Sequence, residues 1–255
     1  MKFKKCVCCC LVLGAVFGCV TLPGCSAFTN NPTDIQTNSS ELKTASDSSK
    51  AATGRDLTVP VENTFNPSDY SKHLSSYGIS ESIIGDSLEE LSNAAEEIIQ
   101  GRIVSIEYFA FEGRAHTKAN VTVEKVISGS LQEGHTISVF LRQGYIPLSE
   151  QVAWDETEGG AKFEYTAKEL ANTIIEECEL GEELAKVGDD AVFYLSCNAV
   201  KEMGGYARVN GGRGEFLYDS KNNSYERANT AVRDENKAFT LEQIEEATRS
   251  AQEGN

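Results

Sequence analysis

Alternating apolar and polar residues constrain the fold of this chain more than any other feature. Within residues 117–127, Val121 and Val123 alternate with Thr122 and Glu124. Within residues 137–142, Ile137, Val139 and Leu141 occupy every second position. Residues 97–109 precede them as a run rich in isoleucine, valine and aromatic residues, and Glu112-Gly113 supplies a turn between the first two segments. A period of two is that of a β-strand with one buried face. The sequence therefore predicts three antiparallel strands in a meander.

Further strands are expected in the second half of the chain. Residues 191–197 form an apolar run after a Gly-Asp-Asp turn, and this run is long enough for a central strand buried on both faces. Residues 206–209 and 214–218 add shorter strands. Five or six such strands predict a β-rich α+β protein. Its expected core is a small antiparallel, partly open β-barrel of the OB type with peripheral helices, because closure hides strand edges.

Helix starts are marked by capping boxes, in which serine or threonine is followed three residues later by glutamate or glutamine. They occur at Ser87, Thr166 and Thr240, and the last opens an amphipathic closing helix. Residues 145–187 break the rhythm of the strands and are predicted to be an insertion into the barrel. Within it, a helix is expected from Thr166 to a stop at Gly181.

The N-terminus has the pattern of a secretory signal. Lysine occupies three of the first five positions, and residues 6–22 carry no charge. A spanning helix needs about 20 apolar residues, whereas glycine and proline interrupt this run. Residues 1–24 are therefore predicted to be a signal peptide that is removed after export.

Leu22-Pro23-Gly24-Cys25 resembles the lipobox of bacterial lipoproteins, an aliphatic, a variable and a small residue before a cysteine. The resemblance implies that Cys25 carries a lipid and holds the protein at the extracytoplasmic face of the cell membrane. Two or more acyl chains anchor stably, whereas one binds marginally. Val16-Phe17-Gly18-Cys19 is a second match, so Cys19 remains the alternative lipidated residue.

Residues 25–67, called the tether below, join the lipidated cysteine to the predicted domain. Serine, threonine, asparagine, aspartate and alanine dominate the tether, and such a segment cannot bury enough surface to offset its ordering entropy. A flexible chain of this length extends roughly 35 Å on average. We therefore expect a disordered spacer followed by a single β-rich extracellular domain at residues 68–255.

The order of elements in residues 94–220 resembles uncharacterised OB-like extracellular domains of Gram-positive bacteria. The resemblance is carried by an early strand, the segment 121–129, a strand at Ile137 and a Gly-Asp turn before the apolar run. This chain departs from those shorter domains at the insertion. The resemblance implies a barrel fold and does not imply an activity.

The charge of the chain excludes one class of partner. The 255 residues carry 39 acidic against 23 basic side chains, a formal charge of −16 that becomes −19 when the three signal lysines are removed. Such a field repels a phosphate backbone, so no nucleic-acid partner is expected. The acidic residues are spread along the chain, which is typical of a solvated surface.

Motifs for catalysis and metal binding are absent from the sequence. His73, His116 and His135 show no metal-ligand spacing, and no nucleophile signature is present. We therefore assign no catalytic residue, metal or cofactor and favour a protein that is not an enzyme. The alternative is a hydrolase of cell-wall polysaccharide acting through two carboxylates. Its candidates are Asp155, Glu156, Glu158, Glu176, Glu177, Asp189 and Asp190.

Two cysteines lie within the predicted domain. Cys178 and Cys197 are candidates for a disulfide worth roughly 3 kcal/mol, given the length of the loop between them. The alternative is two separate thiols that pack as small apolar groups.

Aromatic residues cluster in the insertion at Tyr145, Trp154, Phe163 and Tyr165. If exposed, they are suited to binding a sugar or a protein, and the alternative is that they pack the insertion's own core. The leading prediction is a lipid-anchored surface module that binds an envelope protein or glycan through this surface.

Overall fold

A computed structural model describes residues 60–78, 85–158, 164–197, 204–231 and 237–254. The predicted signal peptide, both candidate lipidation cysteines and most of the tether lie outside these residues. In the described part of the chain, no helix is long and apolar enough to cross a membrane.

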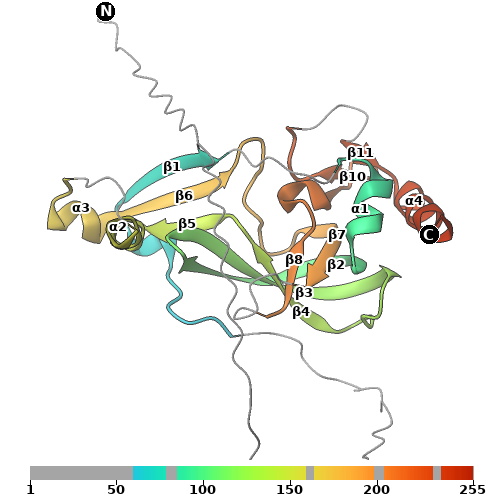
Figure 1. Cartoon of the computed structure of the whole chain (residues 1–255), viewed down its shortest axis with the longest axis horizontal. Helices are drawn as coiled ribbons and strands as arrows, with labels where there is room; N and C mark the ends of the chain where they lie inside the picture. The colour runs from blue at the N-terminus through green and yellow to red at the C-terminus, as the bar shows by residue number, and fades with distance from the viewer. Residues whose placement is uncertain (1–59, 79–84, 159–163, 198–203, 232–236, 255) are drawn as a thin grey trace, which may run out of the picture. The chain divides into compact units, whose positions relative to one another are not determined.

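Among the described residues, five strands close into a barrel (Figure 1). They are β2 (Glu97–Phe111), β3 (Arg114–Ser128), β4 (Thr136–Leu141), β7 (Asp190–Cys197) and β8 (Tyr206–Arg208). Strands β2, β3 and β4 form an antiparallel meander, β4 pairs in parallel with β8, and β7 closes the ring by pairing antiparallel with β8 and β2. This confirms the predicted β-rich, OB-like barrel. The ring is closed, where a partly open one was expected, and its β4–β8 pair is parallel.

Inward-facing side chains of the alternating strands fill the barrel. Fully or nearly fully buried residues of this core include Ile99, Ile103, Val121, Val123, Ile137, Val139, Leu141, Phe193 and Leu195. Strand β2 bends around them through register shifts near Gly101. A Cβ atom on Gly101 would lie 2.7 Å from the carbonyl oxygen of Thr122, so glycine permits the close approach of β3.

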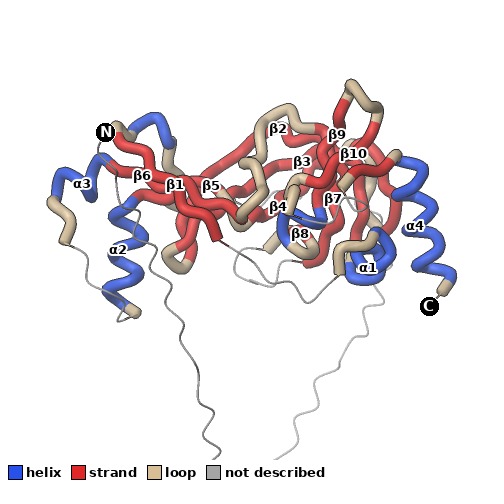
Figure 2. The backbone as a smooth tube through the Cα atoms, turned by 90° about the horizontal axis from the view of Figure 1, so that it is seen from above, coloured by secondary structure: helices blue, strands red, loops and turns tan. Residues whose placement is uncertain are grey.

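A second core lies outside the ring, where the sheet continues from β7. The added strands are β9 (Glu215–Asp219), β10 (Ser224–Arg227) and β11 (Ala238–Phe239), and the covering helices are α1 (Leu88–Ala94) and α4 (Leu241–Glu253). Val192 and Tyr194 of β7 face this core with Phe216, whereas Phe193 faces the barrel. Strand β7 is therefore buried on both faces, as predicted. Figure 2 shows α1 and α4 at the same end of the domain as β9 and β10.

The insertion forms a sheet of its own with the segment that precedes α1. Its order is β1 (Lys72–Gly78), β6 (Thr173–Glu179) and β5 (Gly144–Pro147), and the helices are α2 (Leu148–Thr157) and α3 (Ala167–Asn172). Ile146, Leu148 and Ile175 pack against Ala115 of the β2–β3 hairpin. This sheet, with α2 and α3, lies at the opposite end of the domain from α1 and α4 (Figure 2).

One predicted element is wrong. The capping box at Thr166 is present, but the helix ends at Asn172, and residues 173–179 form β6 where a helix was expected to continue. Thr173, Ile174 and Ile175 are β-branched residues that favour a strand. Pairing with β1 on one side and β5 on the other satisfies the backbone of β6.

Contacts with the barrel begin before residue 68, where the domain was expected to start. Val61 packs against Phe109 and Phe140, and Phe65 forms a β-bridge with Tyr108. The last residues assigned to the tether thus lie along the β2–β3 hairpin. A short 3₁₀ helix, η1 (Pro67–Asp69), then leads into β1.

Candidate functional site

The predicted aromatic surface is partly used in packing the insertion. The Tyr145 hydroxyl donates to a carboxylate oxygen of Glu176 at 3.0 Å, and the ring packs edge-on against Tyr108 with centroids 5.0 Å apart. Burial and this carboxylate raise the pKa of Tyr145 to about 12. Tyr145 therefore joins β5 to β6 and to the hairpin.

The other three aromatic residues differ in their placement. Trp154 of α2 lies over Gly113 at the tip of the β2–β3 hairpin, where an added Cβ atom would lie 2.4 Å from the indole ring. Trp154 and Tyr165 are 37% and 38% exposed, so both keep a face toward solvent. Phe163 lies outside the described residues.

The two cysteines of the domain are free thiols, so the candidate disulfide is not formed and the alternative of two separate thiols applies. Cys178 is buried on β6, whereas Cys197 is exposed at the end of β7 in the barrel. Burial raises the pKa of the Cys178 thiol, and a hydrogen bond with the Glu96 carboxylate raises that of Cys197. Both shifts favour the neutral thiol, the less nucleophilic form.

The carboxylates proposed for a hydrolase lie in three separate places, which are the C-terminal end of α2, strand β6 and the start of β7 with the turn before it. Glu176 and Glu177 are adjacent on β6 and point to opposite faces. Glu177 accepts hydrogen bonds from the Ala115 amide at 2.8 Å and from Gln151 at 3.2 Å. In the described ranges, no group of three or more His, Cys, Asp or Glu side chains is placed to hold a metal ion.

A groove of about 380 Å³ lies between the start of α4 and strands β2, β3, β7, β9 and β10. Its size is within the range of small-ligand sites, roughly 300–1,000 Å³. The groove is defined by the residues that line it, which are Gln100, Glu124, Asp190, Tyr218, Asn223, Tyr225, Leu241 and Glu242.

The β9–β10 hairpin places two tyrosines in the groove. Tyr218 and Tyr225 are directly paired across the hairpin, with ring centroids 5.3 Å apart and planes at 47°. The Tyr218 hydroxyl donates to the side-chain oxygen of Asn223 at 3.0 Å, and Asn223 has the positive φ of 50° that this tight turn requires. Tyr225 is 6% exposed and Tyr218 is 41% exposed. Tyr225 is therefore fixed in place, whereas Tyr218 presents its ring to solvent.

The first turn of α4 supplies the opposite side of the groove. Thr240 caps the helix by accepting from the Gln243 amide, and the Gln243 side chain accepts from the Thr240 amide. This capping box fixes Leu241 and Glu242 at the helix N-terminus. Backbone hydrogen bonding there and the Thr240 hydroxyl lower the pKa of Glu242, so its carboxylate stays ionised.

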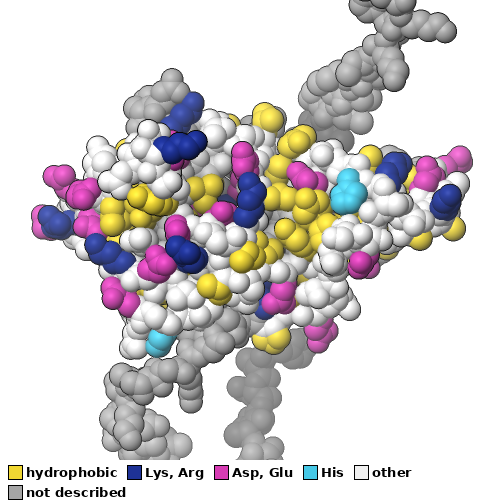
Figure 3. Space-filling view, turned by 180° about the vertical axis from the view of Figure 1, so that it is seen from behind, with side chains coloured by type: hydrophobic (Ala, Val, Ile, Leu, Met, Phe, Trp, Pro, Cys, Tyr) yellow, Lys and Arg dark blue, Asp and Glu magenta, His cyan; other side chains and the backbone are white. Residues whose placement is uncertain are grey.

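The electrostatic environment of the groove is negative. Glu124, Asp190 and Glu242 line it, and in the described part of the chain no lysine or arginine does. Arg102 lies beside the groove and pairs with Asp190 through Nε and Nη2, at 2.7 and 2.8 Å. Its Nε also lies 3.5 Å from Glu124. Burial raises the pKa of Tyr225, with smaller contributions from the neighbouring Tyr218, Asp190 and Glu124. Elsewhere, on the face in Figure 3, acidic and basic side chains are interspersed.

A buried charge cluster lies at the start of β9, a strand that also lines the groove. The Arg208 guanidinium lies 2.7 Å from Glu182 and 2.5 Å from Glu215, and all three side chains are at most 3% exposed. Gly212, in the 3₁₀ helix η2 (Gly211–Gly214), leaves room for Glu182, since an added Cβ would lie 2.5 Å from its carboxylate. The cluster joins the end of the insertion to β8 and β9.

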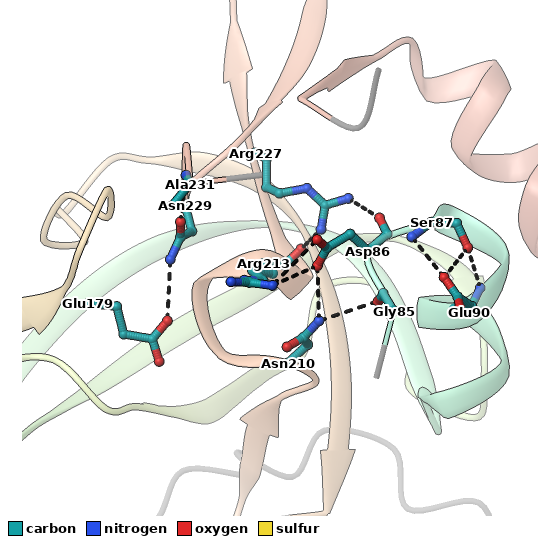
Figure 4. A network of polar contacts seen from close by, with 10 residues as sticks. All are labelled: Gly85, Asp86, Ser87, Glu90, Glu179, Asn210, Arg213, Arg227, Asn229 and Ala231. Atoms are coloured by element: carbon teal, nitrogen blue, oxygen red, sulfur yellow. Dashed lines mark hydrogen bonds and ion pairs between the residues drawn. The ribbon is translucent and has the colours of Figure 1, made fainter. Parts of the chain in front are cut away.

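A polar network fixes η2 against the segment before α1 (Figure 4). Arg213 pairs with Asp86 at 3.1 Å, and Arg227 donates to the Asp86 carbonyl oxygen at 2.6 Å and also to the Arg213 carbonyl oxygen. Asn210 donates to the carbonyl oxygen of Gly85 at 3.3 Å. The glycine-rich segment that contains η2 therefore has a structural role beneath β9 and β10.

Comparison with known proteins adds no assignment to this geometry. The sequence matches no protein-family model, and a search of curated proteins gives no match.

Proposed function

We propose that this protein is a lipid-anchored extracytoplasmic module that binds an envelope ligand, protein or glycan, in the groove beside α4. The groove itself carries the proposal, because it combines an exposed aromatic face with amide and carboxylate groups in a cavity of ligand size. The lipobox-like sequence at Cys25 supports the anchor, and the polar tether supports reach into the envelope.

Binding is favoured over the alternative of carboxylate-dependent hydrolysis. A general acid at neutral pH requires a carboxyl with a raised pKa, beside a second carboxylate. Glu242 has a lowered pKa, and Asp190 is held by Arg102. Burial raises the pKa of Glu215, but that carboxyl is enclosed with Arg208 and does not line the groove.

The test uses the mature polypeptide, residues 25–255, with Cys25→Ser so that no lipid contributes to retention. The protein is incubated with envelopes of the bacterium that produces it, and the fraction retained after washing is measured. Tyr218→Ala is the groove variant. Tyr165→Ala is the matched control, since the two tyrosines are 41% and 38% exposed and Tyr165 lies in the aromatic surface predicted from the sequence.

We expect Tyr218→Ala to weaken retention about tenfold, as for loss of an aromatic anchor, with Tyr165→Ala close to wild type. Equal retention of the two variants, or no retention of wild type above background, would refute the proposal. Mass spectrometry of the mature N-terminus tests the anchor separately, since an unmodified Cys25 contradicts it.

A further inference from the structure

We infer that the groove beside α4 recognises an organic ammonium group on its ligand. The inference rests on the proposed function and names the ligand chemistry of the same site. Three observations carry it, which are the charge of the lining, the paired tyrosine rings and the hydrogen-bond acceptors that line the groove.

The charge of the lining selects for a cation. The carboxylates of Glu124, Asp190 and Glu242 line the groove. Arg102, beside the groove, offsets one of these three negative charges, so the lining keeps a net formal charge of two negative units. Lys125 lies nearby on β3 but is paired with Glu245 at 2.5 Å. An anionic ligand is repelled by this arrangement, whereas a cationic one replaces its lost hydration with carboxylate contacts.

The tyrosine pair selects for an organic cation over a metal ion. The face of an aromatic ring attracts an ammonium group and also packs against the carbon atoms that carry it. Tyr218 is 41% exposed and stands 5.3 Å from Tyr225, centroid to centroid. A hard metal ion instead requires several converging oxygen ligands, and the described residues contain no such acidic group.

Hydrogen-bond acceptors are available for the ammonium protons. A primary ammonium has three donors and no acceptor. The carboxylate of Glu242 comes from α4, and that of Glu124 comes from β3, so the acceptors lie on different elements that line one cavity. The Asn223 and Gln100 amides add acceptors for the rest of the ligand.

A lysine side chain of a peptide and an amino sugar share this ammonium group, so the experiment includes both. The mature polypeptide with Cys25→Ser is labelled with ¹⁵N and titrated with Nα-acetyl-lysine methylamide and with glucosamine. Each probe has a neutral partner of nearly the same shape, the Nε-acetylated lysine derivative and N-acetylglucosamine. Shifts of the backbone amides of Tyr218 and Glu242 report binding in the groove.

We expect at least one ammonium probe to shift these amides and to bind at least about tenfold more tightly than its acetylated partner. The probe that binds then identifies the source of the ammonium group. Glu242→Gln should weaken binding about three- to tenfold and should make it less sensitive to salt. Glu133→Gln is the control, since Glu133 is exposed on the turn before β4 and does not line the groove.

The inference is refuted if neither ammonium probe shifts the groove amides, or if the acetylated partners bind equally well. It is also refuted if Glu133→Gln weakens binding as much as Glu242→Gln, because the attraction then comes from the net charge of the whole protein. Loss of envelope retention in Tyr218→Ala without ammonium binding would leave the proposed function standing and refute only this inference. Ammonium binding without envelope retention would refute only the proposed function.

Discussion

Replacement of Arg208 by methionine tests whether the buried charge cluster holds the insertion to the barrel. Arg208 is the shared cation of Glu182 and Glu215, at 2.7 and 2.5 Å, and the three side chains are 3%, 0% and 2% exposed. Arg208→Met fills similar volume but leaves two buried carboxylates without a cation. Breaking a buried ion pair in this way costs about 3–5 kcal/mol. That is a large part of the roughly 5–15 kcal/mol that stabilises a typical protein.

The control for this variant is Glu215→Gln. It leaves Arg208 paired with Glu182 one to one, and the amide oxygen still accepts a hydrogen bond, so the free energy of unfolding should change by about 1 kcal/mol or less. Burial raises the pKa of Glu215 above the 4.5 of the unfolded chain. The folded state therefore holds this proton more tightly. Wild type should lose stability as the pH rises through the raised pKa, and Glu215→Gln should lack that loss.

Urea unfolding of the mature Cys25→Ser polypeptide, followed by circular dichroism at several pH values, measures these effects. We expect Arg208→Met to lower the free energy of unfolding by about 3–5 kcal/mol at neutral pH. At roughly 2–4 °C per kcal/mol, the melting temperature should fall by about 6 °C or more. A free energy of unfolding within 1 kcal/mol of wild type, or equal losses in the two variants, would refute the reasoning.

Three further predictions follow from single residues. Burial lowers the pKa of His116 to about 4, so its contribution to stability is complete above the unfolded pKa of 6.5. The free energy of unfolding should fall by up to about 3 kcal/mol as the pH drops toward 4. His116→Phe should abolish this loss when urea unfolding is compared at pH 7 and 4.5. Gly113→Ala should lower the free energy of unfolding by about 1–3 kcal/mol, because residue 113 has a positive φ and the new Cβ would meet the indole of Trp154. The fluorescence of Trp154, the chain's single tryptophan, should change, and unchanged emission would contradict this. Native alkylation of the Cys25→Ser polypeptide should modify the exposed Cys197 and spare Cys178 until unfolding, and an unreactive pair that reduction releases would show a disulfide instead.

The barrel could be predicted from the sequence because its signals are local. Alternation within β3 and β4 and the two-sided burial of β7 each depend on a few neighbouring residues. The capping box at Thr166 marked a helix start correctly but carried no information on length. Tertiary pairing with β1 and β5 then decided the conformation of residues 173–179. Strand β1 was missed because all seven of its residues are exposed, so it has no hydrophobic period to detect.

The candidate site could not be predicted because its parts are distant in the sequence. Its lining runs from Gln100 to Glu242 and draws on five strands and a helix. Residues 214–218 were predicted to form a strand, but nothing local indicated that Tyr218 lines a groove together with a carboxylate on β3. The charge cluster is similar, since Glu182 and Arg208 are 26 positions apart and meet only when the insertion ends against β8.

The central claim, that this groove binds an envelope ligand in the anchored protein, is tested most directly by photocrosslinking on intact cells. A benzoyl-phenylalanine replaces Tyr218 in the full chain with its native signal and Cys25, and a second protein carries the same group at Glu133. We expect a discrete adduct from position 218, and its yield should fall when Glu124→Gln and Glu242→Gln are added. An adduct of equal yield from position 133, or none from position 218, would contradict it.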